Sequence, residues 1–145
     1  MTALRDTGRA MSQENVELVQ SLYRDCFAAA DLDLVPELLH PDVVWTAIES
    51  APDSGTRHGH AAAREHMGDW LNAFDFGAMP TEHVATTADG RLVCALYAVG
   101  TEKKLGLTTD IRYAAVFRFA EDGRILNIHE YAAVDEALEA VGLSE

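Results

Sequence analysis

Positive charge is scarce in this sequence of 145 residues. Lysine and arginine together number 11, against 24 aspartates and glutamates, so the formal net charge at neutral pH is -13. A field of this sign repels the phosphates of nucleic acids and of anionic lipid headgroups. The densest basic pair, Lys103 and Lys104, stands next to Glu102 in a stretch that is typical of a hairpin turn. We therefore expect no nucleic acid and no membrane among the partners.

Cysteine and long apolar runs are scarce as well. Cys26 lies in a helical pattern and Cys94 in a strand-like pattern, which favours two buried free thiols over a disulfide or a zinc site. No apolar run approaches the roughly 18 residues that span a bilayer, and residues 1–10 lack the apolar stretch of a secretory signal. We therefore expect a cytoplasmic protein.

The composition is that of one ordinary globular domain. Hydrophobic residues make up 48% of the chain and charged residues 24%, and a chain of this length buries one core. Residues 1–10 have no periodicity, so we expect a flexible N-terminal extension followed by a single domain over residues 11–145.

Helical spacing appears at four places. From Ser12, a plausible N-cap, apolar residues recur at steps of three and four up to about Ala30. A shorter helix follows Asp31 or Asp33, and we expect it to end at Pro41. The same spacing predicts a third helix from about His60 to Phe74 and a last short one over residues 134–143.

Strand patterns fill most of the rest. We expect strands over residues 42–49, 81–87, 91–100, 108–119 and 124–133, and a loop over residues 50–59. This order predicts an α+β fold with the helices on one side of a curved, mostly antiparallel sheet. The uncovered face, which carries Arg112 and Arg118, favours a symmetric homodimer.

Several segments together resemble the SnoaL-like proteins of the nuclear transport factor 2 superfamily. They are MSQENVELVQSLYRDCFAAADLDLVPELLHPDVVW, RHGH, VFRFAEDGRI and DEALEAVGL, and the similarity covers about residues 11–143. The resemblance implies a cone-shaped α+β roll in which a strongly curved sheet wraps around the N-terminal and middle helices. It also implies a mostly apolar pocket at one end of the cone. It does not specify an activity, because this fold hosts enzymes and binding modules.

Comparison with characterised subfamilies picks out two candidate catalytic residues. Tyr23 has the spacing of the oxyanion-hole tyrosine of ketosteroid isomerases, although Ala47 and Ala115 stand where those enzymes carry their two acidic groups. Glu130 stands where limonene epoxide hydrolases carry a catalytic aspartate on the last strand. The arginine and second aspartate of those hydrolases have no counterpart near residues 95–98.

Glu130 is the stronger of the two candidates for chemistry. Strand alternation would turn its side chain into the pocket with Ile128 and Ala132. An apolar surrounding favours the protonated form of a carboxyl group, which suits a general base near neutral pH. The alternative is a glutamate at the pocket mouth that pairs with an arginine.

The other candidates are ligand-binding residues, chosen as apolar or aromatic side chains near the expected pocket. They are Phe27, Trp45, Ala47, Met67, Trp70, Phe74, Tyr97, Tyr113 and Phe117. Each of the aromatic residues can equally be part of the core. His58 and His60 have poor spacing for a metal site with Glu49. We place His66 off the apolar stripe of its helix and expect His129 to alternate away from Glu130, so most of the histidines are expected to be solvated or interfacial. We therefore expect no metal and no cofactor.

Two functions remain open from the sequence. The first is a cofactor-free isomerase- or cyclase-type enzyme that acts on a small, mostly apolar carbonyl compound, with Glu130 as general base and Tyr23 polarising the carbonyl. The second is a non-catalytic dimeric module that binds a small hydrophobic ligand.

Overall fold

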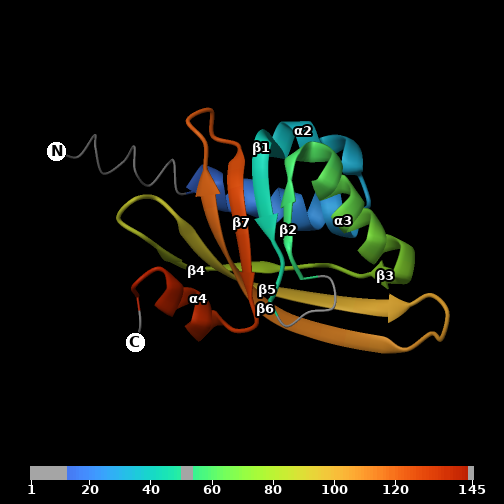
Figure 1. Cartoon of the computed structure of the whole chain (residues 1–145). Helices are drawn as coiled ribbons and strands as arrows, with labels where there is room; N and C mark the ends of the chain where they lie inside the picture. Colours follow the sequence, from blue (N-terminus) through green and yellow to red (C-terminus); the bar gives the residue numbers. More distant parts are fainter. Residues whose placement is uncertain (1–12, 50–53, 144–145) are drawn as a thin grey trace.

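A computed structural model describes residues 13–49 and 54–143, so the extension expected over residues 1–10 lies outside the described residues. The described part of the chain starts with an α-helix over residues 13–21 that continues as the π-helix η1. The elements then follow in this order (Figure 1): η1 (Leu22–Ala28), η2 (Leu32–Leu34), α2 (Val35–Leu38), β1 (Leu39–Thr46), β2 (Thr56–His58), α3 (Gly59–Ala73), β3 (Phe74–Phe76), β4 (Thr81–Thr86), β5 (Leu92–Glu102), β6 (Thr108–Phe119), β7 (Ile125–Tyr131) and α4 (Val134–Ala140). None of the described helices is long and apolar enough to cross a bilayer.

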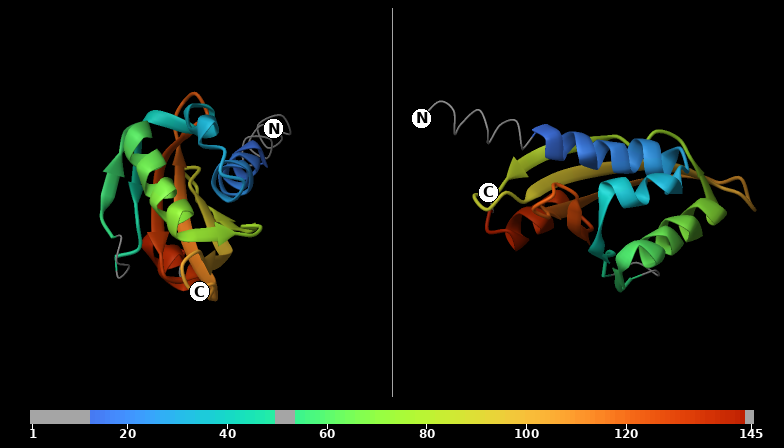
Figure 2. Two further views of the ribbon diagram at one scale, coloured as in Figure 1. Left: turned by 90° about the vertical axis from the view of Figure 1, so that its right-hand side faces the viewer. Right: turned by 90° about the horizontal axis from the view of Figure 1, so that it is seen from above.

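The strands form one mixed, strongly curled sheet of seven strands. Its order is β2-β1-β7-β6-β5-β3, with β4 paired to β5 beside β3. β1 and β7 run parallel, and the other pairs are antiparallel. The long strands β5 and β6 pair from Leu92 with Phe117 to Thr101 with Thr108. The predicted α+β fold with a curved, mostly antiparallel sheet is thus confirmed (Figure 2).

The main core lies between the concave face of the sheet and the helices η1, α2 and α3. Strand alternation turns Val43 and Trp45 of β1 inward, and both are fully buried. From the helices, Tyr23, Cys26 and Met67 meet them, and all three are also fully buried. Burial of a large apolar side chain stabilises the fold by roughly 1.5–3 kcal/mol. This contact therefore fixes where α3 sits on the sheet.

The expectation that all helices lie on one side of the sheet is wrong for α4. This helix lies away from α2 and α3 in Figure 1 and packs against β5, β6 and β7. A second apolar cluster joins it to the convex face, formed by Val93, Ala114, Val116, Ala137 and Leu138. The sheet buries apolar side chains on both faces here, because residues at alternating positions of β5 and β6 are apolar on either side. Part of the face expected to be uncovered is therefore covered by α4.

Two short strands were not expected from the sequence. β2 lies inside the stretch expected to be a loop, where Thr56–His58 pairs with β1. β3 follows α3 directly and pairs with the end of β5. Strands of three residues are too short to show an alternating pattern. Pro41 does not end a helix, because α2 already ends at Leu38 and Pro41 lies within β1.

A strained alanine, Ala30, follows the C-cap of η1 and offers a stability test. Ala30 is exposed and has φ 59°, a left-handed conformation that costs a residue with a Cβ about 1–2 kcal/mol. We expect Ala30→Gly to raise the free energy of unfolding by about 0.5–1 kcal/mol, since relief of strain outweighs the larger chain entropy of glycine. Urea denaturation measures the difference.

Ala29 provides the matched control for this substitution. Its φ of -81° is right-handed, so Ala29→Gly adds chain entropy without relieving strain and is expected to lower the free energy of unfolding by about 0.5–1 kcal/mol. A loss of stability in Ala30→Gly equal to that of Ala29→Gly would contradict the left-handed geometry of Ala30.

Candidate functional site

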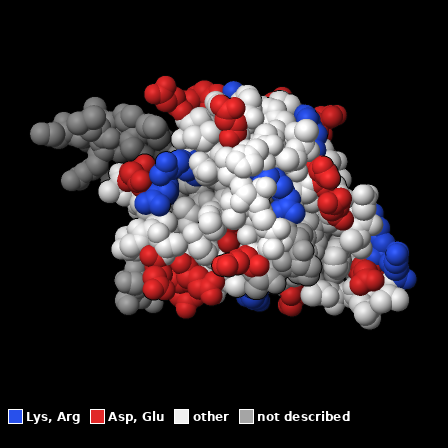
Figure 3. Space-filling view, in the orientation of Figure 1, with Lys and Arg blue, Asp and Glu red and all other residues white. Residues whose placement is uncertain are grey.

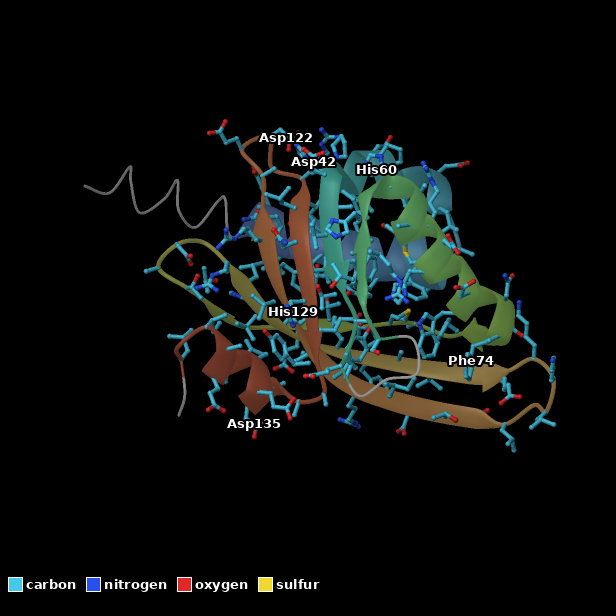
Figure 4. All side chains as sticks on the ribbon, viewed as in Figure 1. Asp42, His60, Phe74, Asp122, His129 and Asp135 are labelled. Atoms are coloured by element: carbon cyan, nitrogen blue, oxygen red, sulfur yellow. The ribbon has the colours of Figure 1, made fainter. Side chains whose placement is uncertain are left out.

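Glu130 lies on the inner face of β7, as strand alternation predicted. Its cross-strand partner in β6 is Ala115, a fully buried residue of the main core. The neighbouring His129 points the other way, and its ring stacks on that of Tyr131 at 4.6 Å between centroids. Figure 4 shows His129 midway along the molecule. The half-buried Glu130 is thus turned toward the helices.

A cavity of about 160 Å³ opens next to Glu130. Its wall is mostly apolar and is contributed by η1, α3, the segment around β3, and the strands β5 to β7. The lining residues are Phe27, Ile48, His66, Trp70, Phe76, Met79, Ala98, Ile111, Tyr113 and Glu130. His66, Tyr113 and Glu130 are the titratable side chains in this lining. The cavity therefore combines an apolar body with a few polar groups, which is the usual make-up of a small-molecule site.

An open groove of about 690 Å³ adjoins this inner cavity. Ile48 and Glu130 line both spaces, so Glu130 lies where the cavity meets the groove. The groove also contains Ala47 and the carboxylates of Glu49 and Glu136. Acidic side chains gather over the α4 region in the same area of the surface (Figure 3). The acidic residues of the groove would disfavour an anionic ligand by charge repulsion.

Tyr23 lies behind the cavity wall. Its ring is fully buried and packs edge-on against Phe117 at 6.2 Å. Burial raises the pKa of Tyr23 well above its usual range, and the nearby Tyr113, Glu130 and Cys94 raise it further. Tyr113 interacts with the Tyr23 hydroxyl, yet no contact of this hydroxyl within the described chain has the geometry of a full hydrogen bond. The structure thus brings Tyr23 and Glu130 together with Tyr113.

His66 is a cavity residue, so the expectation of a solvated or interfacial histidine is wrong at this position. It is only 4% exposed, and its ring lies edge-to-face against Trp45 at 5.0 Å. The helical spacing could have predicted this position, because His66 lies three or four residues from its apolar neighbours on one helix face. These neighbours are Ala63, Met67 and Trp70. A histidine on that face is buried against the sheet with its neighbours.

The structure separates the other expected ligand-binding residues into three groups. Phe27, Trp70 and Tyr113 line the inner cavity, and Ala47 lines the groove. Trp45, Met67 and Phe117 are fully buried in the core and are not among the residues that line the cavity. Phe74 begins β3 at the far end of α3 (Figure 4), where its ring packs with those of Trp70 and Phe76.

Tyr97 was expected to bind a ligand in the inner pocket, but its side chain lies on the convex face of the sheet. Its cross-strand partner is Arg112, whose guanidinium lies over the Tyr97 ring at 4.7 Å from the centroid. Its hydroxyl donates to Asp110 at 3.4 Å. The even-numbered residues of β5, such as Leu96 and Ala98, point into the main core. Tyr97 is odd-numbered, so its side chain points to the opposite face. It lines an outer cleft of about 440 Å³, which shares the lining residue Tyr113 with the inner cavity.

The described residues hold no group of three or more metal-ligating side chains. His60 is engaged elsewhere, since its Nε2 lies 2.7 Å from the backbone carbonyl oxygen of Leu39. Burial raises the pKa of the Cys26 thiol to about 11 and that of Cys94 to about 12, so both are protonated at neutral pH. Neither thiol lines the inner cavity, whose titratable lining residues are His66, Tyr113 and Glu130.

A strongly curled α+β sheet around buried helices, with a cavity between them, defines the nuclear transport factor 2-like class of folds. The sequence itself matches the SnoaL-like domain family over residues 19–128, and the chain therefore belongs to that family. No curated protein matches the sequence.

Solved structures share this fold at low sequence identity. A proposed polyketide cyclase from Xanthomonas campestris is 19% identical, with a TM-score of 0.68 over 91% of this chain and 99% of the other. SalBIII, an epoxide hydrolase/cyclase-like enzyme of pyran ring formation in salinomycin, is 21% identical, with a TM-score of 0.67 over 82% and 90%. A Mycobacterium tuberculosis protein in complex with estradiol-17beta-hemisuccinate is 20% identical, with a TM-score of 0.66 over 81% and 92%.

The environment of the Tyr23 hydroxyl can be tested by its removal. A buried hydroxyl without a full hydrogen bond costs about 1–3 kcal/mol, so we expect Tyr23→Phe to raise the free energy of unfolding at pH 7 by about 1 kcal/mol. Because the folded-state pKa of Tyr23 is raised, the folded form keeps its proton while the unfolded chain ionises above pH ~10. The wild type should therefore lose stability relative to Tyr23→Phe as the pH rises beyond ~10.

Tyr97→Phe is the control, since its hydroxyl lies on the convex face; its stability should stay within ~0.5 kcal/mol of the wild type. A Tyr23→Phe variant that is less stable than the wild type by more than ~1 kcal/mol would show that the hydroxyl is fully hydrogen-bonded.

Proposed function

We propose that this protein binds a small, mostly apolar carbonyl compound in the inner cavity and that Glu130 acts there as a general base. The observation that carries this proposal is the position of Glu130, which lies on the inner face of β7, lines the apolar cavity and is also a lining residue of the open groove. A carbonyl compound in the cavity would present its acidic C–H bonds to this carboxylate. No cofactor is part of the proposal, because proton abstraction next to a carbonyl needs a base and an oxyanion stabiliser.

The size of the cavity limits the part of the ligand that enters it. An apolar cavity of ~150 Å³ holds one benzene ring, so the inner cavity of about 160 Å³ accommodates one six-membered ring. A larger ligand would extend past Glu130 into the groove. Substituents there should be neutral or cationic, because Glu49 and Glu136 line the groove.

Tyr23 has a different role from the one expected from its spacing. Tyr113 and Phe27 line the cavity, whereas Tyr23 is not among the lining residues. We propose that Tyr23 is a positioning residue, because its fully buried ring lies behind the cavity wall, close to Tyr113 and Glu130. Its location in a π-helix fits this role, because π-helical turns occur frequently at functional sites.

Relatives with the same fold support a small-molecule function in general. One of them was solved with estradiol-17beta-hemisuccinate, and another takes part in pyran ring formation. At this level of identity the likeness shows the fold alone, so neither ligand is carried over to this chain.

Binding without catalysis is the alternative, and two buried alanines favour it. Ala47 and Ala115 stand where ketosteroid isomerases carry acidic groups, and both are buried. An enzyme of this class would therefore depend on Glu130 with partners other than those of the ketosteroid isomerases. A homodimer through the convex face, a cytoplasmic location and the lack of nucleic-acid or membrane partners stay predictions.

Glu130→Gln tests the general base directly. Cyclohexanone in D₂O reports on proton abstraction, because each abstraction exchanges a hydrogen beside its carbonyl for deuterium. We expect the wild type to accelerate this exchange and Glu130→Gln to lose about 10²–10⁴-fold of the enzyme-dependent rate, since the amide retains the shape but cannot accept the proton. NMR or mass spectrometry follows the exchange, and tryptophan fluorescence, to which Trp70 in the cavity lining contributes, follows binding.

Glu139→Gln is the matched control, because Glu139 is an exposed glutamate on α4 that does not line the cavity or the groove. It should exchange cyclohexanone at the wild-type rate. Binding by the wild type without any accelerated exchange would favour the non-catalytic alternative. Full activity in Glu130→Gln would exclude Glu130 as the base.

A further inference from the structure

His66 and Glu130 approach the inner cavity from its two walls. His66 projects from α3, which forms the helical side, and Glu130 projects from β7, which forms the sheet side. A cavity of about 160 Å³ holds one ring, so a ligand within it lies close to both walls. The two groups thus face the same ligand from different directions.

The packing around His66 holds its ring in place. The side chain is 4% exposed, and the indole of Trp45, which is fully buried, lies edge-to-face against it. One helical turn further on, Trp70 continues the same wall of the cavity. A ring that is fixed in this way presents its nitrogen atoms in a constant direction, which preorganises any hydrogen bond that it makes.

We propose that His66 is the group that donates a hydrogen bond to the carbonyl oxygen of the ligand, opposite the base Glu130. This inference rests on the proposed function. It assigns to His66 the polarising role that sequence spacing had given to Tyr23, and it defines the ligand as a neutral, single-ring-sized ketone or aldehyde with hydrogen next to the carbonyl carbon.

The two residues together complete a balanced proton transfer. Glu130 takes the proton as the C–H bond beside the carbonyl breaks, and the electron pair of that bond becomes the new carbon–carbon double bond. The carbonyl π electrons move to oxygen, where the N–H of His66 stabilises the developing charge. Return of the proton from Glu130 to the same or to a conjugated carbon restores the carbonyl, so the cycle consumes no other reactant.

Binding of two matched probes tests the role of His66 without relying on turnover. Cyclohexanone carries a carbonyl oxygen, and methylenecyclohexane has nearly the same shape without it. We expect the wild type to bind cyclohexanone more tightly than methylenecyclohexane. In His66→Phe this preference should fall about tenfold, while the affinity for methylenecyclohexane stays within about threefold of the wild type.

His66→Gln is the conservative variant, because its amide can still donate a hydrogen bond. It should retain part of the preference that His66→Phe loses. In the wild type, the ring ¹⁵N signals of His66, assigned by their absence from the His66→Gln spectrum, should shift more with cyclohexanone than with methylenecyclohexane. This measurement is made on the wild type, so it does not depend on whether a cavity variant is stable enough to bind the ligand.

The outcomes separate this inference from the proposed function. If cyclohexanone binds and exchanges but its preference is the same in the wild type and in His66→Phe, then the role of His66 is wrong and that of Glu130 stands. Equal shifts of the His66 signals with both probes would likewise exclude His66 as the donor. If neither probe binds the wild type, the cavity proposal fails, and this inference fails with it.

Discussion

The packing of α3 against the concave face of the sheet is the contact on which the rest of the structure depends. Trp45 and Met67 are fully buried where β1 and α3 meet, and this contact sets the distance between helix and sheet. Once that distance is set, smaller side chains further along cannot fill the space. Ala98 on β5 is one of them, and it lines the cavity. The cavity thus forms where the large side chains between α3 and the sheet are followed by smaller ones.

The same interface explains why a few polar groups matter in an otherwise apolar interior. His66, Tyr113 and Glu130 line a cavity whose other walls are apolar, so their charges and dipoles are weakly screened by water. Electrostatic interactions with a ligand are therefore stronger here than on the surface. Behind them, the Tyr23 hydroxyl is kept neutral by burial, which raises its pKa. In the proposed reaction, donors and an acceptor around one cavity would supply the groups that proton abstraction from carbon requires.

The sequence predicted the fold and the direction of Glu130 but not the full composition of the site. The direction of Glu130 was readable because it follows the buried Ile128 by two residues and therefore shares its face of the strand. In β5 nearly every side chain is apolar, since α4 and the core cover opposite faces, and the phase of Tyr97 was therefore ambiguous. His66 was missed although its spacing matched the buried helix face. The short strands β2 and β3 depend on pairing with β1 and β5, which no local pattern encodes.

We propose that a ligand occupies the inner cavity and not the outer cleft beside Tyr97. Intermolecular nuclear Overhauser effects between bound cyclohexanone and assigned methyl groups measure this location directly. We expect contacts with the methyl groups of Met79 and Ile111, which line the inner cavity. Contacts confined to the methyl groups of Thr81 and Val134, which line the outer cleft, would contradict it.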